Sequence, residues 1–100
     1  MQSGEFAAVT PGEILKEEFL AEYDLSQGAL ARAIGISANR ITEIISNRRR
    51  ITADTALRLA LYFGNSPEFW MNLQANYDLR VAQHNLPTEE ADRIKARRAA

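Results

Sequence analysis

The 100-residue sequence contains no cysteine and a single histidine, His84, in a composition that is 46% hydrophobic and 25% charged. The absence of cysteine excludes disulfide scaffolds and zinc fingers built on cysteine, and one histidine is too few for a histidine-ligated metal site. His84 falls near an expected helix end, where a cation interacts favourably with the helix dipole, so a catalytic role is not indicated. We therefore expect a protein that is not an enzyme and that binds no metal or cofactor.

Long apolar segments are also missing. The longest unbroken apolar run, residues 59–63, is far shorter than the roughly 20 residues of a membrane-spanning helix. The N-terminus has no basic stretch followed by an apolar one, as a signal peptide would have. These absences predict a cytoplasmic protein with no membrane partner. The length of 100 residues fits one domain, and residues 1–9 are expected to form a flexible lead.

The net charge of −1 conceals an uneven distribution of charge along the chain. Residues 1–24 carry six acidic side chains and one basic one, whereas residues 25–50 carry five basic side chains and one acidic one. A locally basic segment can present a cationic face to a polyanion even in a neutral protein. The alternative is a solvated charge cluster with no partner.

Start and stop signals at short intervals predict six helices and no strands. Thr10 and Pro11 begin the first helix, which is expected to end at about Tyr23. The others are expected over residues 27–34, 38–46, 53–63 and 67–85 and after a cap at Thr88. The expected N-caps of the four middle helices are Ser26, Ser37, Thr52 and Ser66, and Gly35 and Gly64 are typical helix ends.

Only Gly35 and Ile36 separate the second helix from the cap of the third, and so tight a turn predicts a helix-turn-helix unit. On the third helix, three isoleucines fall within about 100° of arc. They are Ile41, Ile44 and Ile45. The opposite side carries hydrogen-bonding residues, namely Asn39, Thr42, Glu43 and Ser46, with Arg40 at the border. The third helix is thus expected to have one core face and one polar face.

The polar face suits the major groove of DNA, because amide, guanidinium, carboxylate and hydroxyl side chains can each hydrogen-bond base edges. The predicted base-contacting residues are Asn39, Arg40, Thr42 and Glu43. Helix N-termini and the basic loop that follows the third helix are suited to phosphates. The predicted phosphate-contacting residues are Gln27, Ser37, Asn47, Arg48 and Arg49.

The fourth and fifth helices each carry two apolar stripes. On the fourth, one stripe contains Ala56, Leu59, Ala60 and Phe63, and the other contains Leu57 and Leu61. On the fifth, one stripe contains Phe69, Trp70, Leu73, Tyr77 and Val81, and the other contains Met71, Ala75, Leu79 and Ala82. One stripe of the fifth helix can close the core, and the second is expected to form the interface of a homodimer. The alternative is that the second stripe rests on the sixth helix.

Several motifs resemble known families. Leu25-Ser26-Gln27, Ala31, Ile34-Gly35-Ile36-Ser37, Arg40-Ile41 and Ile44 resemble the Xre/Cro class of bacterial and phage repressors. Residues 11–15 (PGEIL), 49–59 (RRITADTALRL) and 63–74 (FGNSPEFWMNLQ) are similar to the HigA antitoxin family, including VapI-like proteins. The resemblance covers roughly residues 10–83.

The resemblance implies an all-α, lambda-repressor-like domain of five helices, over residues 10–86. The tail over residues 87–100 lies outside the resemblance, and its short sixth helix is predicted from the cap at Thr88. It implies a homodimer that binds double-stranded operator DNA in its own promoter and represses it. By position, Gln27, Ser37, Asn39, Arg40, Thr42 and Glu43 correspond to the operator-contacting surface, and the fifth helix to the dimer region. Members of the family also bind and silence a HigB toxin, a RelE-like ribonuclease.

Two other functions remain open. The protein can instead act mainly as an inhibitor of a RelE-like toxin, with its acidic first helix meeting the cationic surface of the ribonuclease and DNA binding secondary. It can also be a solitary Xre-type regulator with no toxin.

Overall fold

A computed structural model describes residues 8–98 of the chain, and this part is all-α. The expected flexible lead falls mostly on residues 1–7, which lie outside the described residues, as do residues 99–100. The elements are α1 (Pro11–Ile14), η1 (Leu15–Leu20), α2 (Gln27–Ile34), α3 (Ala38–Ile45), α4 (Ala53–Phe63), α5 (Pro67–Asn85) and α6 (Thr88–Ala96). α1 and η1 form one continuous helical segment, so the all-α fold and the number and order of the helices are confirmed. No helix within residues 8–98 combines the length and apolar character needed to cross a bilayer.

Side-chain caps fix where the helices begin. Thr10 and Glu13 form a capping box, in which each side chain accepts a hydrogen bond from the other residue's backbone N–H. The hydroxyls of Ser26, Ser37, Thr52 and Ser66 each accept a backbone N–H of their own helix, as predicted. Gly35 and Gly64 end α2 and α4 with φ of 75° and 77°, a left-handed conformation that glycine adopts without steric cost.

Two predicted helix ends are wrong. The first helix ends at Leu20 rather than at Tyr23, and its last six residues wind as a π-helix. Asp24 has a φ of 51°, which turns the chain, and the Leu25 N–H then bonds to the Leu20 carbonyl at 2.9 Å. Thr88 does not cap the last helix. Pro87, held by its ring near a φ of −65° and extended at a ψ of 148°, occupies the N-cap position, and no side chain accepts a bond there.

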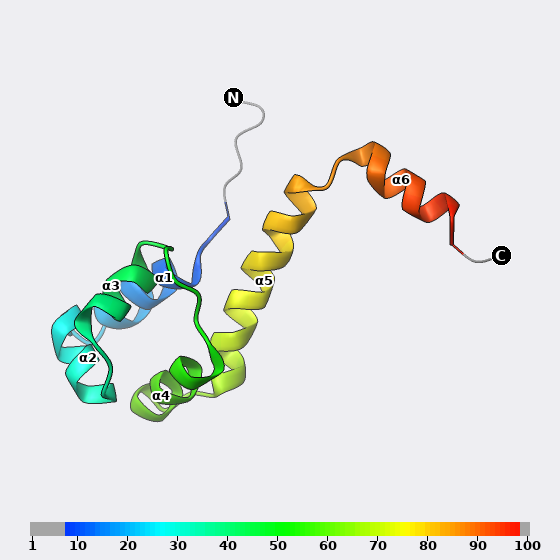
Figure 1. Ribbon diagram of the computed structural model, residues 1–100. Coiled ribbons are helices and arrows are strands. Elements are labelled where there is room, and N and C mark those ends of the chain that lie inside the picture. The colour runs from blue at the N-terminus through cyan, green and yellow to red at the C-terminus, as the bar shows by residue number, and fades with distance from the viewer. Residues whose placement is uncertain (1–7, 99–100) are drawn as a thin grey trace.

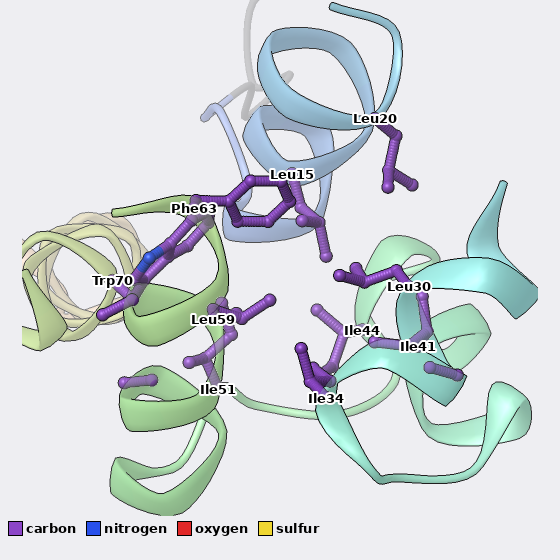
Figure 2. Close-up of a cluster of buried hydrophobic side chains, with 13 residues drawn as sticks. Leu15, Leu20, Leu30, Ile34, Ile41, Ile44, Ile51, Leu59, Phe63 and Trp70 are labelled. Atoms are coloured by element: carbon purple, nitrogen blue, oxygen red, sulfur yellow. The ribbon is translucent and has the colours of Figure 1, made fainter. Parts of the chain in front are cut away.

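The core lies where the first five helices meet, and ten of its large side chains are labelled in Figure 2. The first stripe of α4 is buried, whereas Leu57 and Leu61 of its second stripe are exposed. The ring centroid of Phe19 lies 4.9 Å from that of Phe63 and 4.8 Å from that of Trp70. The buried Trp70 donates its indole N–H to Asn65 Oδ1 at 2.9 Å, so its one polar atom is satisfied. This cluster joins the first helical segment to α4 and α5.

α1 and α3 pack in unusually close contact. A Cβ atom at Gly12 would lie 2.2 Å from the backbone oxygen of Ile44 and 2.7 Å from the Cα of Ile45. Any side chain at this position would therefore force α3 outward, because the atoms in the way belong to the backbone. Gly12 thus sets the position of α3 within the domain.

α5 extends beyond the bundle, and α6 leads away from its far end (Figure 1). The first stripe of α5 closes the core mainly through Trp70 and the partly buried Leu73. The second stripe stays exposed, with 37% of Met71 and 58% of Leu79 accessible to solvent. The alternative in which this stripe rests on the sixth helix is therefore wrong.

Candidate nucleic-acid interface

α2, a tight turn and α3 form the helix-turn-helix unit that the sequence predicted, and the two helices lie side by side (Figure 1). The turn is held from outside the unit. Arg58 on α4 donates one guanidinium N–H to the Ile34 carbonyl at 2.8 Å and pairs through Nε with Asp54 at 2.9 Å. The last carbonyl groups of a helix lack partners within the helix, so this cation is well placed to stabilise the end of α2.

α3 has the two faces expected of it. Ile41 and Ile44 are fully buried and Ile45 is partly buried. The opposite side is open to solvent except for the partly buried Glu43. A helix fixed to the core on one side and polar on the other can enter a groove of DNA without rearranging its own packing.

Glu43 is the centre of a short chain of polar contacts on the outer face of α3. Asn39 Nδ2 donates to Glu43 Oε2 at 3.2 Å, one turn away on the same helix. Arg49 Nε donates to the other carboxylate oxygen, Oε1, at 2.8 Å. The contacts fix the orientation of two side chains that were predicted to contact bases and of one predicted to contact phosphate.

The pKa of Glu43 lies below its ordinary value of 4.5. The hydrogen bond from Arg49 is the largest cause, partial burial acts in the opposite direction, and the charges of Arg49 and Arg48 and the bond from Asn39 add to the lowering. The carboxyl group is consequently ionised at neutral pH, where it accepts hydrogen bonds and donates none.

α2 also contributes to this surface. The Thr42 hydroxyl lies 2.9 Å from Gln27 Oε1 and 3.1 Å from the Ala38 carbonyl oxygen. Gln27 is the first residue of α2 and Ser37 caps α3, so both lie at helix N-termini, where backbone N–H groups favour anions. Gln27 and Thr42 are thereby brought together although fifteen residues separate them in sequence.

Arg40 is placed differently from the other predicted base-contacting residues. Its guanidinium Nη1 lies 3.8 Å from Asp54 Oδ2 on α4, and the residue is partly buried. The side chain therefore points toward α4, at the edge of the polar face of α3. To contact a base edge it must exchange this long, weak ion pair for the new bond, which costs little because surface pairs contribute at most about 1 kcal/mol.

The loop between α3 and α4 contains Asn47, Arg48, Arg49, Arg50 and Ile51, and we call it the arginine loop. Arg48 Nε donates to the Ser46 hydroxyl at 2.9 Å, next to the end of α3. All three arginines are exposed. The nine residues predicted to contact bases or phosphates thus come from the start of α2, the N-cap and outer face of α3, and the arginine loop.

Three polar residues of α5 contact the arginine loop although no sequence motif marks them, namely Gln74, Tyr77 and Asp78. In the sequence, Tyr77 falls within an apolar stripe. Gln74 is 4% exposed and lies one turn after Trp70, on the side of α5 that faces the core. A polar residue next to an apolar stripe was the signal that could have identified it, since a buried amide needs partners.

Comparison with known proteins places the chain in a family. The helix-turn-helix family model matches residues 15–70. Virulence-associated protein I of Dichelobacter nodosus is 51% identical over 81 residues, which cover 81% of this chain and 75% of that protein. Antitoxin HigA-1 of Vibrio cholerae is 41% identical over 87 residues, which cover 87% of this chain and 81% of that protein.

Solved structures agree. A structure of Pseudomonas aeruginosa antitoxin HigA with the higBA promoter is 50% identical, covers 76% of this chain and 83% of its own, and superimposes with a TM-score of 0.74. Antitoxin GraA in complex with its operator is 37% identical, covers 100% of this chain and 97% of its own, and has a TM-score of 0.77. Both solved relatives are antitoxins in complex with promoter or operator DNA, in agreement with the expectation that the chain is not an enzyme. By sequence and by fold, the chain belongs to the helix-turn-helix family and, within it, to the HigA antitoxins.

Proposed function

We propose that this protein is a homodimeric repressor that binds an operator in its own promoter. The observation that carries the proposal is the polar outer face of α3, joined to the arginine loop by the Arg49–Glu43 ion pair, on a helix whose other face is buried. Relatives about half identical to this chain have been solved with promoter or operator DNA. Repression follows from occupancy, because a protein on the promoter excludes the polymerase and needs no chemistry of its own. Such a repressor acts in the cytoplasm, where it meets its promoter.

The roles are divided by position. Residues 10–86 form the DNA-binding domain, with α5 as its dimerising helix, and residues 87–100 form a tail. The base-contacting residues are Asn39, Arg40, Thr42 and Glu43, which lie along α3. The phosphate-contacting residues are Gln27, Ser37, Asn47, Arg48 and Arg49, which flank that helix on two sides. On binding, the contacts within the protein between Asn39 and Glu43 and between Arg49 and Glu43 exchange in part for contacts to DNA.

The homodimer forms through the exposed stripe of α5, made of Met71, Ala75, Leu79 and Ala82. A two-fold axis there presents two copies of α3 to successive major grooves, about 34–36 Å or one helical turn apart. The operator is consequently a palindrome with half-sites one turn apart.

The experiment that tests the proposal is titration of a labelled fragment of the protein's own promoter at several salt concentrations, with unrelated DNA as competitor. Saturable, competitor-resistant binding of two monomers per site is the expected result. Weak binding that unrelated DNA displaces at every salt concentration contradicts the proposal, because non-specific affinity is mainly electrostatic.

Substitutions separate base contacts from phosphate contacts. We expect Asn39→Ala to cost about 1–3 kcal/mol of operator binding and to relax the preference at one base pair. Arg48→Ala should instead weaken all sequences alike and reduce the slope of log K against log salt by about 1. A panel of operators with single base-pair changes distinguishes the two, and an equal loss on every operator for Asn39→Ala would refute its role as a base reader.

A second function, capture of a RelE-like toxin ribonuclease of the HigB type, is favoured by the acidic surface of the first helical segment. Glu17 and Glu18 are exposed on η1. An acidic surface suits the cationic RNA-binding face of a ribonuclease and would raise the rate and specificity of association. The relative from Vibrio cholerae is an antitoxin, and an antitoxin implies a toxin as its partner.

The test is the double variant Glu17→Lys, Glu18→Lys, assayed against the product of a small toxin gene adjacent to this one. We expect toxin capture to slow or cease while operator affinity stays close to wild type, since these residues lie apart from α3. Unchanged capture would rule out this surface, and a gene neighbourhood without a toxin gene would favour a solitary regulator.

A further inference from the structure

α5 contacts both ends of the arginine loop. The Tyr77 hydroxyl oxygen accepts a hydrogen bond from Asn47 Nδ2 at 2.8 Å, at the start of the loop. At its end, the backbone N–H of the buried Ile51 donates to Gln74 Oε1 at 2.8 Å. Asn47 has a φ of 62°, a conformation that residues other than glycine adopt uncommonly and that needs local support.

A third contact completes the set. The Asp78 carboxylate accepts a hydrogen bond at Oδ1 from Gln74 Nε2 at 3.0 Å and pairs through Oδ2 with Arg50 Nη1 at 2.6 Å. Both polar ends of the buried Gln74 amide are thereby satisfied, one by the loop backbone and one by the residue that binds Arg50. Positions 74, 77 and 78 lie one helical turn apart, so one side of α5 faces the loop.

From this geometry we infer that Gln74, Tyr77 and Asp78 are positioning residues for DNA binding. They fix the two ends of the arginine loop, and the intervening Arg48 and Arg49 are thereby held in place for phosphate contact. Arg50 is engaged with α5 and serves to anchor the loop. The inference rests on the proposed repressor function and adds to it residues that touch no DNA.

The arrangement also links operator binding to the dimer. The three anchoring residues are centred roughly 100° around α5 from the centre of the exposed stripe that is proposed to form the dimer interface, and Asp78 is the one nearest to it. One rigid helix therefore holds the partner subunit on one side and the arginine loop on another. The separation of the two arginine loops in the dimer is set by two copies of α5, which removes part of the entropic cost of ordering each loop on DNA.

The test begins with Tyr77→Phe, which removes only the hydroxyl oxygen that accepts the Asn47 bond. Affinity for the promoter fragment should fall about three- to tenfold, because the loop loses one of its anchoring hydrogen bonds and must be ordered on the DNA instead. Tyr62→Phe on α4 makes the same chemical change away from the arginine loop and should bind like wild type. Wild-type affinity in Tyr77→Phe would overturn the inference.

A double-mutant cycle separates positioning from general damage to the fold. If Tyr77 acts through the arginines, Tyr77→Phe should reduce affinity by less than about twofold when Arg48 and Arg49 are already alanine, measured at low salt. If the loss is equally large in that background, Tyr77 does not act through the arginines, and the inference fails.

Hydrogen exchange in the free protein distinguishes failure of the inference from failure of the proposed function. Gln74→Met should speed exchange of the Ile51 amide by at least about fivefold relative to wild type, after correction for any change in global stability, because the amide loses its acceptor. Gln83→Met, on the exposed part of α5, is the matched control and should leave that exchange unchanged. Unchanged exchange in Gln74→Met means that the loop is not anchored. If amide exchange in Gln74→Met is as expected but the wild-type protein does not bind its promoter, the repressor function is refuted, and with it the effect on affinity. The anchoring of the loop by α5 then still stands.

Discussion

At the scale of the residue, the absence of a side chain at Gly12 determines how closely α3 can approach α1. The backbone of α3 comes so close that a methyl group at Gly12 would overlap the Ile44 carbonyl oxygen. The obstruction belongs to a backbone already fixed by two buried isoleucines, so it cannot be relieved by a rotamer change.

Gly12→Ala should therefore destabilise the protein by about 1–3 kcal/mol, the usual cost of overpacking, and should weaken operator binding by displacing α3. Gly28→Ala in α2 is the matched control. There the nearest atom to a new Cβ is the flexible end of Arg32, at 3.6 Å, so alanine should stabilise the helix by about 0.5–1 kcal/mol. Urea unfolding measures both, and equal stabilities for the two variants would contradict the packing argument.

The pH dependence of the polar face of α3 comes from the ionisation of the Glu43 carboxyl group. Its pKa is lowered in the folded protein, chiefly by the hydrogen bond from Arg49. A group with a lowered folded-state pKa stabilises the fold above its unfolded pKa, here near 4.5, and that contribution is lost as the pH falls through the folded value. The Glu43 network is therefore intact throughout the neutral range.

Arg49→Ala should raise the pKa of Glu43 toward 4.5, because it removes both the largest hydrogen bond and a neighbouring charge. Arg48→Ala removes a charge interaction only and should raise the pKa less. NMR titration of the Glu43 carboxyl carbon in the three proteins gives the order. A larger effect from Arg48→Ala would show that the Arg49 hydrogen bond is not formed in solution.

At the scale of the element, two leucines of α4 lie in opposite environments. Leu59 is fully buried in the core, whereas Leu61, two residues later, is 84% exposed. Two residues advance an α-helix by about 200°, so the two side chains must point to nearly opposite sides.

Leu59→Ala should cost about 2–5 kcal/mol, since it leaves a cavity in a packed core. Leu61→Ala removes the same atoms from solvent and should change stability by less than about 0.5 kcal/mol. Thermal or urea unfolding checks both, and a large loss in Leu61→Ala would show that this side of α4 is covered in solution.

At the scale of the whole molecule, the proposed dimer explains why α5 extends past the bundle with an apolar side exposed. The stripe contains Met71 and Leu79 with two small alanines between and beyond them, a pattern that allows close approach of a second helix. A repressor with two recognition helices gains affinity from engaging both half-sites at once.

Leu79→Glu should convert the protein from dimer to monomer at micromolar concentration and reduce operator affinity at least about tenfold, because two buried like charges would face each other across the axis. Leu61→Glu places the same charge on an exposed side of α4 and should stay dimeric. Light scattering coupled to gel filtration measures the mass. A monomer mass for the wild-type protein would refute the proposed dimer directly.

Local signals in the sequence are enough to set the order of the helices and most of their ends. Thr10, Ser26, Ser37, Thr52 and Ser66 cap helices and Gly35 and Gly64 end them because each acts on backbone groups within one turn of itself. Where a prediction failed, at Tyr23 and at Thr88, the competing signal was also local, in Asp24 and Pro87. Helical periodicity likewise separated the buried isoleucines of α3 from its polar face.

The contacts between different helices depend on tertiary structure, because they join residues whose separation in the sequence does not predict their separation in space. Gln27 meets Thr42, Arg40 leans toward Asp54, and α3 rests against Gly12 only once the helices are packed. The anchoring of the arginine loop by Gln74, Tyr77 and Asp78 spans 23 to 30 residues. The residues of a turn specify how the chain bends there. Which side chain accepts a hydrogen bond from an unpaired backbone N–H of the turn depends on the helix packed beside it.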